Sequence, residues 1–305
     1  MPLDKPVNPV DVEFRMDKLE MKTGVFGGGL PFARFGKGAQ PLAVFPGLAD
    51  AAWDATSSGW NLLEHYRRFT DQFTVFVISR KRGLPQGYTT RDMAADYATA
   101  FDHELGPCPI LGISLGGCIA QHFAADYPER VHRLVLASAG YQIDAAGRKI
   151  PEHWLELARQ NRWREFYCNI AKVTVQEFHH TFYQFLVPLL RMKAHNPGDF
   201  LVALAASLQH NSAEILAKIH TPTLVVAGAE DIFFPPVLLR ETVRRIPNSR
   251  LHLITNARHD AYESQRNEFE TTVLGFLRDH ESPNPTVLNL ATVATPVCAA
   301  PLTER

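Results

Sequence analysis

The sequence has almost no net charge, few cysteines and no long hydrophobic run, and each of these shortages excludes a class of protein. With 31 Lys and Arg against 32 Asp and Glu, the formal net charge of −1 supplies no basic field for binding nucleic acid. No stretch approaches the length of a membrane span. Residues 1–14 lack the basic start and apolar run of a secretory signal, so we expect a cytoplasmic protein.

The cysteines also argue against a metal site. None of the four lies in a Cys-x-x-Cys pair, so their spacing gives little support to metal binding. We interpret all of them as free thiols: Cys108, Cys118, Cys168 and Cys298. We expect neither a metal ion nor an organic cofactor.

Apolar residues make up 46% of the chain, which is ample for a core. They gather in short β-favouring runs that alternate with helical patterns, which is typical of a doubly wound, mostly parallel sheet of the α/β class. The strand patterns cover residues 41–45, 73–79, 108–111, 131–137, 222–228 and 251–254, and residues 23–38 predict one or two edge strands. The helical patterns between them cover residues 60–69, 90–105 and 118–127.

One short motif carries the strongest functional signal. Gly112-Ile113-Ser114-Leu115-Gly116 lies between a strand pattern and a helical pattern, which is the setting of a nucleophile elbow. The flanking glycines permit a strained turn that projects the Ser114 hydroxyl from the carboxyl edge of the sheet. The N–H of Leu115, at the start of the helix, would then point at a developing oxyanion. Without this setting the motif says less, because the same five-residue pattern also occurs by chance, and a glycine-rich turn can simply serve close packing.

Two downstream loops supply partners for this serine in the chain order serine, acid, histidine. The strand pattern at 222–228 leads into Glu230 and Asp231, of which we interpret Asp231 as the acid and Glu230 as its rival. Of the 13 histidines, only His259 falls in the loop after the next strand pattern, where it can accept the Ser114 proton.

The loop after residues 41–45 reads Pro46-Gly47-Leu48, and the N–H of Leu48 is the candidate for the second oxyanion donor. With the elbow and the two C-terminal loops, this loop resembles the α/β-hydrolase family, over roughly residues 22–280. Many relatives carry His-Gly where this chain has Pro46-Gly47. A serine at the elbow argues against the haloalkane dehalogenase and epoxide hydrolase branches, which use Asp there. It leaves esterases, lipases, thioesterases, C–C bond hydrolases, peptidases and acyltransferases.

Residues 141–218 interrupt the alternation of strands and helices and are rich in aromatic residues at helical spacing. They predict a helical cap inserted after the sixth strand of the family scheme, which would cover the cleft. Most of the aromatics should pack the cap onto the core, while Phe182, Tyr183 and Phe185 should face the substrate. The other predicted parts are an irregular arm at 1–21, a core at 22–140 and 219–281, and a disordered tail at 282–305.

The resemblance and the motifs together predict a serine hydrolase that cleaves a carboxylic ester, or a related acyl bond, of a small apolar or aromatic substrate through an acyl-enzyme. The second interpretation is a C–C bond hydrolase of a diketone-type ring-cleavage product. That chemistry resembles what relatives with a Gly-x-Ser-x-Gly-Gly elbow and a small cap do. An alternative of another class is a non-catalytic ligand-binding protein on a hydrolase fold. We expect no nucleic acid partner and leave a homo-oligomer open.

Overall fold

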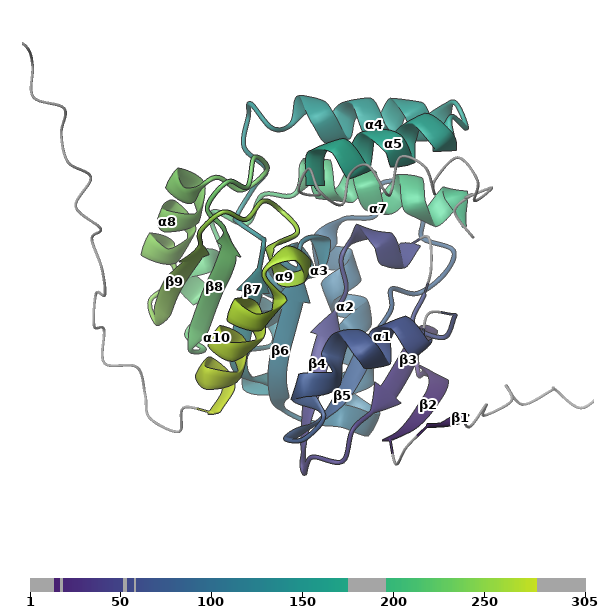
Figure 1. Ribbon diagram of the computed structural model, residues 1–305, viewed down its shortest axis with the longest axis vertical. Helices are drawn as coiled ribbons and strands as arrows, with labels where there is room; N and C mark the ends of the chain where they lie inside the picture. The colour runs from purple at the N-terminus through teal and green to yellow at the C-terminus, as the bar shows by residue number, and fades with distance from the viewer. Residues whose placement is uncertain (1–13, 17–18, 52–53, 58, 175–195, 279–305) are drawn as a thin grey trace, which may run out of the picture.

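The computed structural model describes residues 14–16, 19–51, 54–57, 59–174 and 196–278. These residues form a nine-stranded sheet in the order β1-β2-β3-β5-β4-β6-β7-β8-β9, with helices on both faces (Figure 1). The strands are β1 (Phe14–Met16), β2 (Leu19–Phe26), β3 (Leu30–Phe35), β4 (Gln40–Phe45), β5 (Phe73–Ile78), β6 (Cys108–Ile113), β7 (Val131–Ala137), β8 (Thr223–Gly228) and β9 (Ser249–Ile254). Pairing is antiparallel from β1 to β5 along the sheet and parallel from β5 to β9. The prediction of a mostly parallel, doubly wound sheet is confirmed.

Both faces of the sheet are buried by helices. The helices flanking it are α1 (Gly59–Tyr66), α2 (Thr90–Ala100), α3 (Leu115–Asp126), α8 (Pro236–Arg245), α9 (Ala261–Ser264) and α10 (Arg266–Arg278). Along β4, Ala43 and Phe45 join a core cluster with α2, α3 and α8, while Leu42 and Val44 join a second cluster with α1 and α10. Successive side chains of a strand point to opposite faces, so a strand covered on both sides reads as a continuous apolar run.

The prediction of an irregular arm over residues 1–21 is wrong in part. Phe14–Met16 forms β1 and pairs antiparallel with the start of β2, so that Phe14 lies opposite Met21. Pairing along the sheet edge satisfies the backbone groups of both segments, which local sequence patterns do not reveal. The rest of the arm, residues 1–13 and 17–18, and the predicted tail at 282–305 lie outside the described residues.

Residues 141–218, which we call the helical insertion, lie between β7 and β8. Their described part holds α4 (Lys149–Arg159), α5 (Trp163–Thr174) and α7 (Pro197–Gln209), which form a separate layer above the sheet (Figure 1). Asp199 in α7 accepts hydrogen bonds from the backbone N–H groups of Gly83 (3.0 Å) and Leu84 (2.7 Å) in the loop after β5. The insertion is therefore fastened over the loops that leave the sheet.

The chain enters and leaves the helical insertion at one place. Gln142 and Asn211 form an isolated antiparallel bridge, and Ser212 donates its backbone N–H to the carbonyl of Tyr141 at 2.9 Å. This junction joins two segments that are almost 70 positions apart in the sequence.

A buried histidine pair lies beneath this junction. His210, which ends α7, is buried, and its Nδ1 lies 3.0 Å from the hydroxyl of Thr90 in α2. The ring of His122 in α3 lies perpendicular to it, with 5.3 Å between ring centroids. Burial, and then the neighbouring His122, lowers the pKa of His210 to about 3. The folded protein therefore holds this imidazole neutral well below the pH at which an unfolded histidine takes up its proton.

This arrangement predicts a loss of stability on acidification. An unfolded histidine binds a proton below about pH 6.5, whereas His210 in the fold does not, so its contribution is present above that pH and is lost as the pH falls. Between pH 7 and pH 5 the free energy of unfolding should fall by about 2 kcal/mol through this group. Urea unfolding at both pH values should show that the free energy of unfolding of His210→Gln depends correspondingly less on pH. The control His132→Gln, at an exposed position, should behave like the wild type. An equal change in the free energy of unfolding between pH 7 and pH 5 in all three proteins would contradict the prediction.

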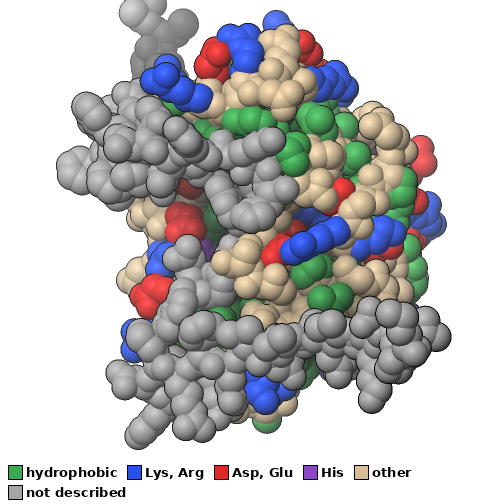
Figure 2. Space-filling model, turned by 90° about the vertical axis from the view of Figure 1, so that its right-hand side faces the viewer, with side chains coloured by type: hydrophobic (Ala, Val, Ile, Leu, Met, Phe, Trp, Pro, Cys, Tyr) green, Lys and Arg blue, Asp and Glu red, His purple; other side chains and the backbone are tan. Residues whose placement is uncertain are grey.

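Among the described residues, no helix is long and apolar enough to cross a membrane. On the face shown in Figure 2, acidic and basic side chains are interspersed with hydrophobic ones. This distribution agrees with the near-zero net charge of the chain.

Candidate active site

The predicted site residues follow four different strands of the parallel part of the sheet. Leu48 follows β4, Ser114 follows β6, Asp231 follows β8 and His259 follows β9. The carboxyl ends of parallel strands meet at one edge, where open α/β sheets hold their ligands. The topology therefore brings residues from distant parts of the chain to one place.

Ser114 occupies a strained turn between β6 and α3. Its φ of 52° and ψ of −116° lie in a region that residues with a side chain rarely adopt. A Cβ on Gly116 would lie 1.9 Å from the carbonyl oxygen of Phe45, and one on Gly112 would lie 2.7 Å from the carbonyl oxygen of Gly116. Real Cβ atoms essentially never come within 3.0 Å of another heavy atom, and the atoms approached here are backbone. A larger residue at either position would therefore force the backbone to move.

Ser114, His259 and Asp231 form a continuous chain of hydrogen bonds. The Oγ of Ser114 lies 2.9 Å from Nε2 of His259, and Nδ1 of His259 lies 2.8 Å from Oδ2 of Asp231. The side chain of Asp231 is 0% exposed and that of His259 is 13% exposed. The geometry fits a neutral imidazole that donates from Nδ1 to the carboxylate and accepts at Nε2. The rival acid, Glu230, is exposed.

The loop after Asp231 fixes both the carboxylate and the imidazole. Oδ1 of Asp231 accepts hydrogen bonds from the backbone N–H groups of Phe233 (2.9 Å) and Phe234 (3.2 Å), which leaves Oδ2 for His259. The His259 ring packs perpendicular to the Phe233 ring at 5.0 Å and stacks on the Phe234 ring at 5.9 Å. Sequence reasoning missed these two aromatics. The sequence did hold a signal for them. An aspartate often accepts hydrogen bonds from the backbone two or three positions further on, and Phe233 and Phe234 stand at those positions after Asp231.

The two backbone groups predicted as oxyanion donors belong to segments that adjoin the elbow. Leu115 is the first residue of α3, so its N–H has no partner within the helix. Gly47, directly before Leu48, packs against the elbow, since a Cβ placed on it would lie 3.6 Å from Cβ of Ser114. The structure thus brings the loop after β4 close to the serine.

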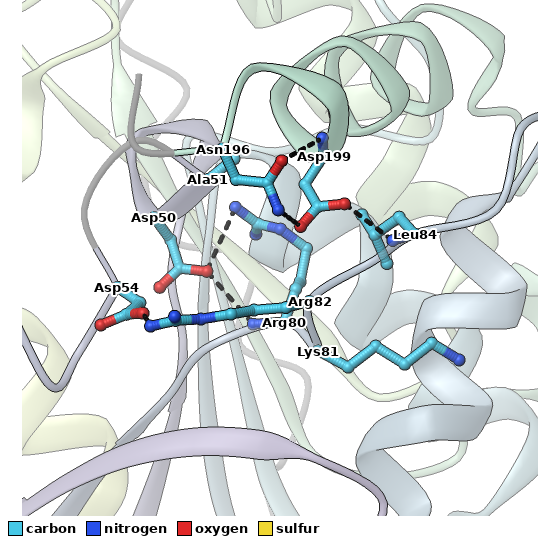
Figure 3. A pocket seen from close by; sticks show the side chains of 9 residues that line it. All are labelled: Asp50, Ala51, Asp54, Arg80, Lys81, Arg82, Leu84, Asn196 and Asp199. Carbon is cyan, nitrogen blue, oxygen red and sulfur yellow. Dashed lines mark hydrogen bonds and ion pairs between the residues drawn. The ribbon is translucent and has the colours of Figure 1, made fainter. Parts of the chain in front are cut away.

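A buried ion pair, also missed by sequence reasoning, supports this loop. Arg80, directly after Ser79 at the end of β5, donates to the carbonyl oxygens of Pro46 (3.0 Å) and Gly47 (2.9 Å). Its guanidinium also lies 3.4 Å from Oδ2 of Asp50. Burial raises the pKa of the Asp50 carboxyl, and Arg80 opposes that shift. Figure 3 shows the pair at the wall of a cavity of about 160 Å³ between this loop and α7.

Three aromatics predicted to face the substrate, Phe182, Tyr183 and Phe185, lie outside the described residues. The described aromatics of the helical insertion mostly pack on one another. The Phe166 ring lies within 6.3 Å of those of Trp154 and Trp163, and all three side chains are buried.

Two of the cysteines are buried and poorly reactive. Burial raises the pKa of the Cys108 and Cys118 thiols to about 12, which keeps them protonated and poorly nucleophilic. Cys168 is also a free thiol, and Cys298 lies outside the described residues. These residues hold no group of three or more His, Cys, Asp or Glu that could bind a metal ion.

A doubly wound sheet with a serine, histidine and acid at its carboxyl edge defines the class of the α/β hydrolases. The family model described as alpha/beta hydrolase fold matches residues 76–265, which is more than half of the chain. The chain belongs to this family and is an enzyme, a hydrolase.

Similar proteins carry several hydrolase names. A poly(3-hydroxyalkanoate) depolymerase from Ectopseudomonas oleovorans is 32% identical over 157 residues, which are 50% of this chain and 54% of the relative. The chain thus matches about half of that relative's length. A 2-hydroxy-6-oxononadienedioate/2-hydroxy-6-oxononatrienedioate hydrolase from a Pseudomonas species is 24% identical over 85% of this chain and 95% of its own.

The fold also matches solved structures. An alpha/beta hydrolase enzyme from a Medee basin deep-sea metagenome library superposes with a TM-score of 0.72 at 19% identity. The match covers 90% of this chain and all of that one. At this identity the likeness establishes the fold alone.

Proposed function

We propose that this protein hydrolyses a carboxylic ester, or a related acyl bond, of a small apolar substrate through an acyl-enzyme on Ser114. The observation that carries the proposal is the chain from Ser114 Oγ through His259 to the fully buried Asp231, with links of 2.9 Å and 2.8 Å. Both distances lie within the range in which a base takes a proton from a nucleophile.

The mechanism follows from these contacts. Ser114 attacks the carbonyl carbon while Nε2 of His259 takes the hydroxyl proton, and Asp231 stabilises the imidazolium that results. The N–H groups of Leu48 and Leu115 bind the oxyanion of the tetrahedral intermediate. His259 then protonates the leaving group, and a water molecule, activated by the same histidine, releases the acyl group.

The helical insertion serves in this proposal as a cap over the reacting groups. Its helix α7 is tied to the loop after β5 through Asp199, and α7 also packs against Leu48–Ala51, the segment that carries one oxyanion donor. A cap at this position reduces the access of water and strengthens the electrostatic interactions beneath it.

The names of the relatives support acyl chemistry and leave a second candidate. The named substrate of the Ectopseudomonas oleovorans relative, a poly(3-hydroxyalkanoate), is a polyester. The Pseudomonas relative, which matches 85% of this chain, is named for hydrolysis of a 2-hydroxy-6-oxo dienedioate, and this length of match favours C–C bond hydrolysis as the second candidate. A panel of p-nitrophenyl esters and diketone-type acids should separate the two, because the proposal requires the higher kcat/KM on esters.

Active-site labelling tests the serine mechanism. A fluorophosphonate should label Ser114 in the wild type, as located by mass spectrometry, and labelling should fall strongly in His259→Ala because the hydroxyl loses its base. The matched control is His252→Ala, since His252 lies in β9 and pairs with Glu268 instead. This control should label like the wild type.

Other outcomes of the labelling would contradict the proposal. Modification of another serine would remove Ser114 as the nucleophile, and labelling that does not depend on His259 would remove the histidine as base. A folded protein that is neither labelled nor active on either substrate class would favour a non-catalytic binding protein.

A further inference from the structure

Arg80 is a buried cation whose contacts converge on residues 46–51 after β4, here called the oxyanion loop. Its side chain is 3% exposed. Two of its nitrogens, Nη1 and Nη2, donate to the carbonyl oxygens of Pro46 and Gly47, at 3.0 Å and 2.9 Å. These are the two carbonyls directly before Leu48, so one side chain contacts both peptides that lead into that residue.

The geometry of a trans peptide turns this contact into a constraint on Leu48. The described residues contain no cis peptide bond, so the carbonyl of Gly47 and the N–H of Leu48 point to opposite sides of one planar group. Glycine has more backbone freedom than any other residue, so the peptide after Gly47 needs anchors to keep one orientation. The Gly47 carbonyl also accepts the backbone N–H of Asp50, at 3.3 Å, but the contact with Arg80 is shorter and comes from outside this turn. Rotation of this peptide would direct a carbonyl oxygen, instead of an N–H, at the developing negative charge.

Asp50 holds Arg80 in place. Oδ2 of Asp50 accepts the backbone N–H of Arg80 at 3.1 Å and lies 3.4 Å from its guanidinium, as Figure 3 shows. Oδ1 of Asp50 accepts the hydroxyl of Ser79, which in turn accepts the N–H of Ala55 at 2.8 Å. Arg80 is attached to the end of β5, and its partner Asp50 belongs to the oxyanion loop. The ion pair therefore links this loop to β5.

A role in stability alone explains this arrangement poorly. Burying an ion pair costs desolvation that its attraction often fails to repay, and apolar side chains of similar volume are frequently as stable. Here, in addition, Nε of Arg80 is buried and has no hydrogen-bond partner among the described residues. The guanidinium gives up part of its hydration to hold two backbone carbonyls beside Ser114.

We propose that Arg80 is a positioning residue for the oxyanion hole. By holding the carbonyls of Pro46 and Gly47, it directs the N–H of Leu48 toward the site of the oxyanion. A cation bound to a carbonyl also polarises its peptide, which makes the N–H of the same peptide a stronger donor. The inference rests on the proposed function, because an oxyanion forms only if Ser114 attacks a carbonyl.

The variants are chosen to separate this role from folding. Arg80→Met alone would leave the buried Asp50 without its partner, so the test uses the double variant Arg80→Met/Asp50→Asn, which removes both charges. Arg80→Lys keeps the charge but cannot reproduce the fork that holds two carbonyls. The matched control is Arg82→Met, because Arg82 lines the same cavity but is 66% exposed and pairs with Asp54.

With p-nitrophenyl butyrate as the probe, kcat of the double variant should fall by about 10- to 100-fold, part of the loss expected for a missing oxyanion donor. KM should change by less than about threefold, because the lost interaction is made only in the transition state. Arg80→Lys should recover part of kcat, and Arg82→Met should match the wild type. Thermal unfolding followed by circular dichroism should show a native fold in the wild type and in all three variants.

A spectroscopic measurement addresses the oxyanion directly. An octyl trifluoromethyl ketone should form a hemiketal with Ser114, and fluorine NMR should report the pKa of its oxyanion. Loss of a well-directed Leu48 N–H should raise that pKa in the double variant and leave it unchanged in Arg82→Met, because an N–H that binds the negative charge favours ionisation.

Two results would overturn the inference and can be told apart. If Ser114→Ala abolishes turnover but the folded double variant keeps kcat within about threefold, or keeps the hemiketal pKa, then Arg80 is only structural. If wild-type turnover does not depend on Ser114, the proposed function fails and the role of Arg80 falls with it.

Discussion

Replacing Ser114 with glycine is expected to abolish turnover and to stabilise the fold at the same time. Without its hydroxyl the enzyme loses the proposed nucleophile, and kcat should fall on the order of 10⁵-fold or more. The φ of 52° at this position strains any residue that has a Cβ, whereas glycine adopts it freely. The free energy of unfolding should therefore rise by about 1 kcal/mol, measured by urea denaturation.

Two further variants make this expectation specific. Ser114→Ala should be equally inactive but no more stable than the wild type, because it keeps the Cβ in the strained turn. Ser138→Gly is the matched control, since Ser138 also has a positive φ, of 48°, and is buried, but lies outside the hydrogen-bonded chain. It should gain stability and keep its activity. An active Ser114→Gly protein, or one no more stable than Ser114→Ala, would contradict the strained-nucleophile interpretation.

The second large effect is expected at the acid. Asp231→Asn should lower kcat on the order of 10⁴-fold, because an amide can donate to Nδ1 of His259 and so place the proton on Nε2, where it blocks acceptance from Ser114. The neighbouring Glu230→Gln should retain nearly full activity, since the Glu230 side chain is exposed. Steady-state kinetics on the same ester compares the two.

Unfolding curves of Asp231→Asn and Glu230→Gln provide the control. Both variants should unfold cooperatively, so that a loss of kcat in Asp231→Asn reflects chemistry instead of misfolding. Loss of activity in Glu230→Gln with activity kept in Asp231→Asn would reverse the assignment of the acid.

Much of the site could be predicted because its constraints are local. The glycines around Ser114 are required by contacts within the elbow and with Phe45, and such requirements appear as a short motif. His259 could be chosen among many histidines because the order of the strand patterns leaves one suitable loop. The alternation of buried strands and amphipathic helices likewise predicted the sheet.

The rest depended on contacts between distant positions. Arg80 and Asp50 are 30 positions apart in the sequence. Arg80 is the first of three consecutive basic residues in a Ser-Arg-Lys-Arg-Gly run, and such a run gives no sign of burial, because arginine is almost never fully buried. The pairing of β1 with β2 involves only three residues of β1, too few for a periodic signal. The packing of Phe234 on His259 depends on how two loops meet, and only the folded chain determines that.

The bridge between Gln142 and Asn211 has a consequence for how such a protein can change. Because β7 and β8 are neighbours in the sheet, the chain between them makes an excursion that starts and finishes at one point. An inserted segment that keeps this junction and the contacts of α7 with the loop after β5 is expected to leave the pairing of β7 with β8 unchanged. If the insertion caps the site as proposed, grafting a foreign segment between residues 142 and 211 is expected to change substrate selectivity while Ser114, His259 and Asp231 stay in place.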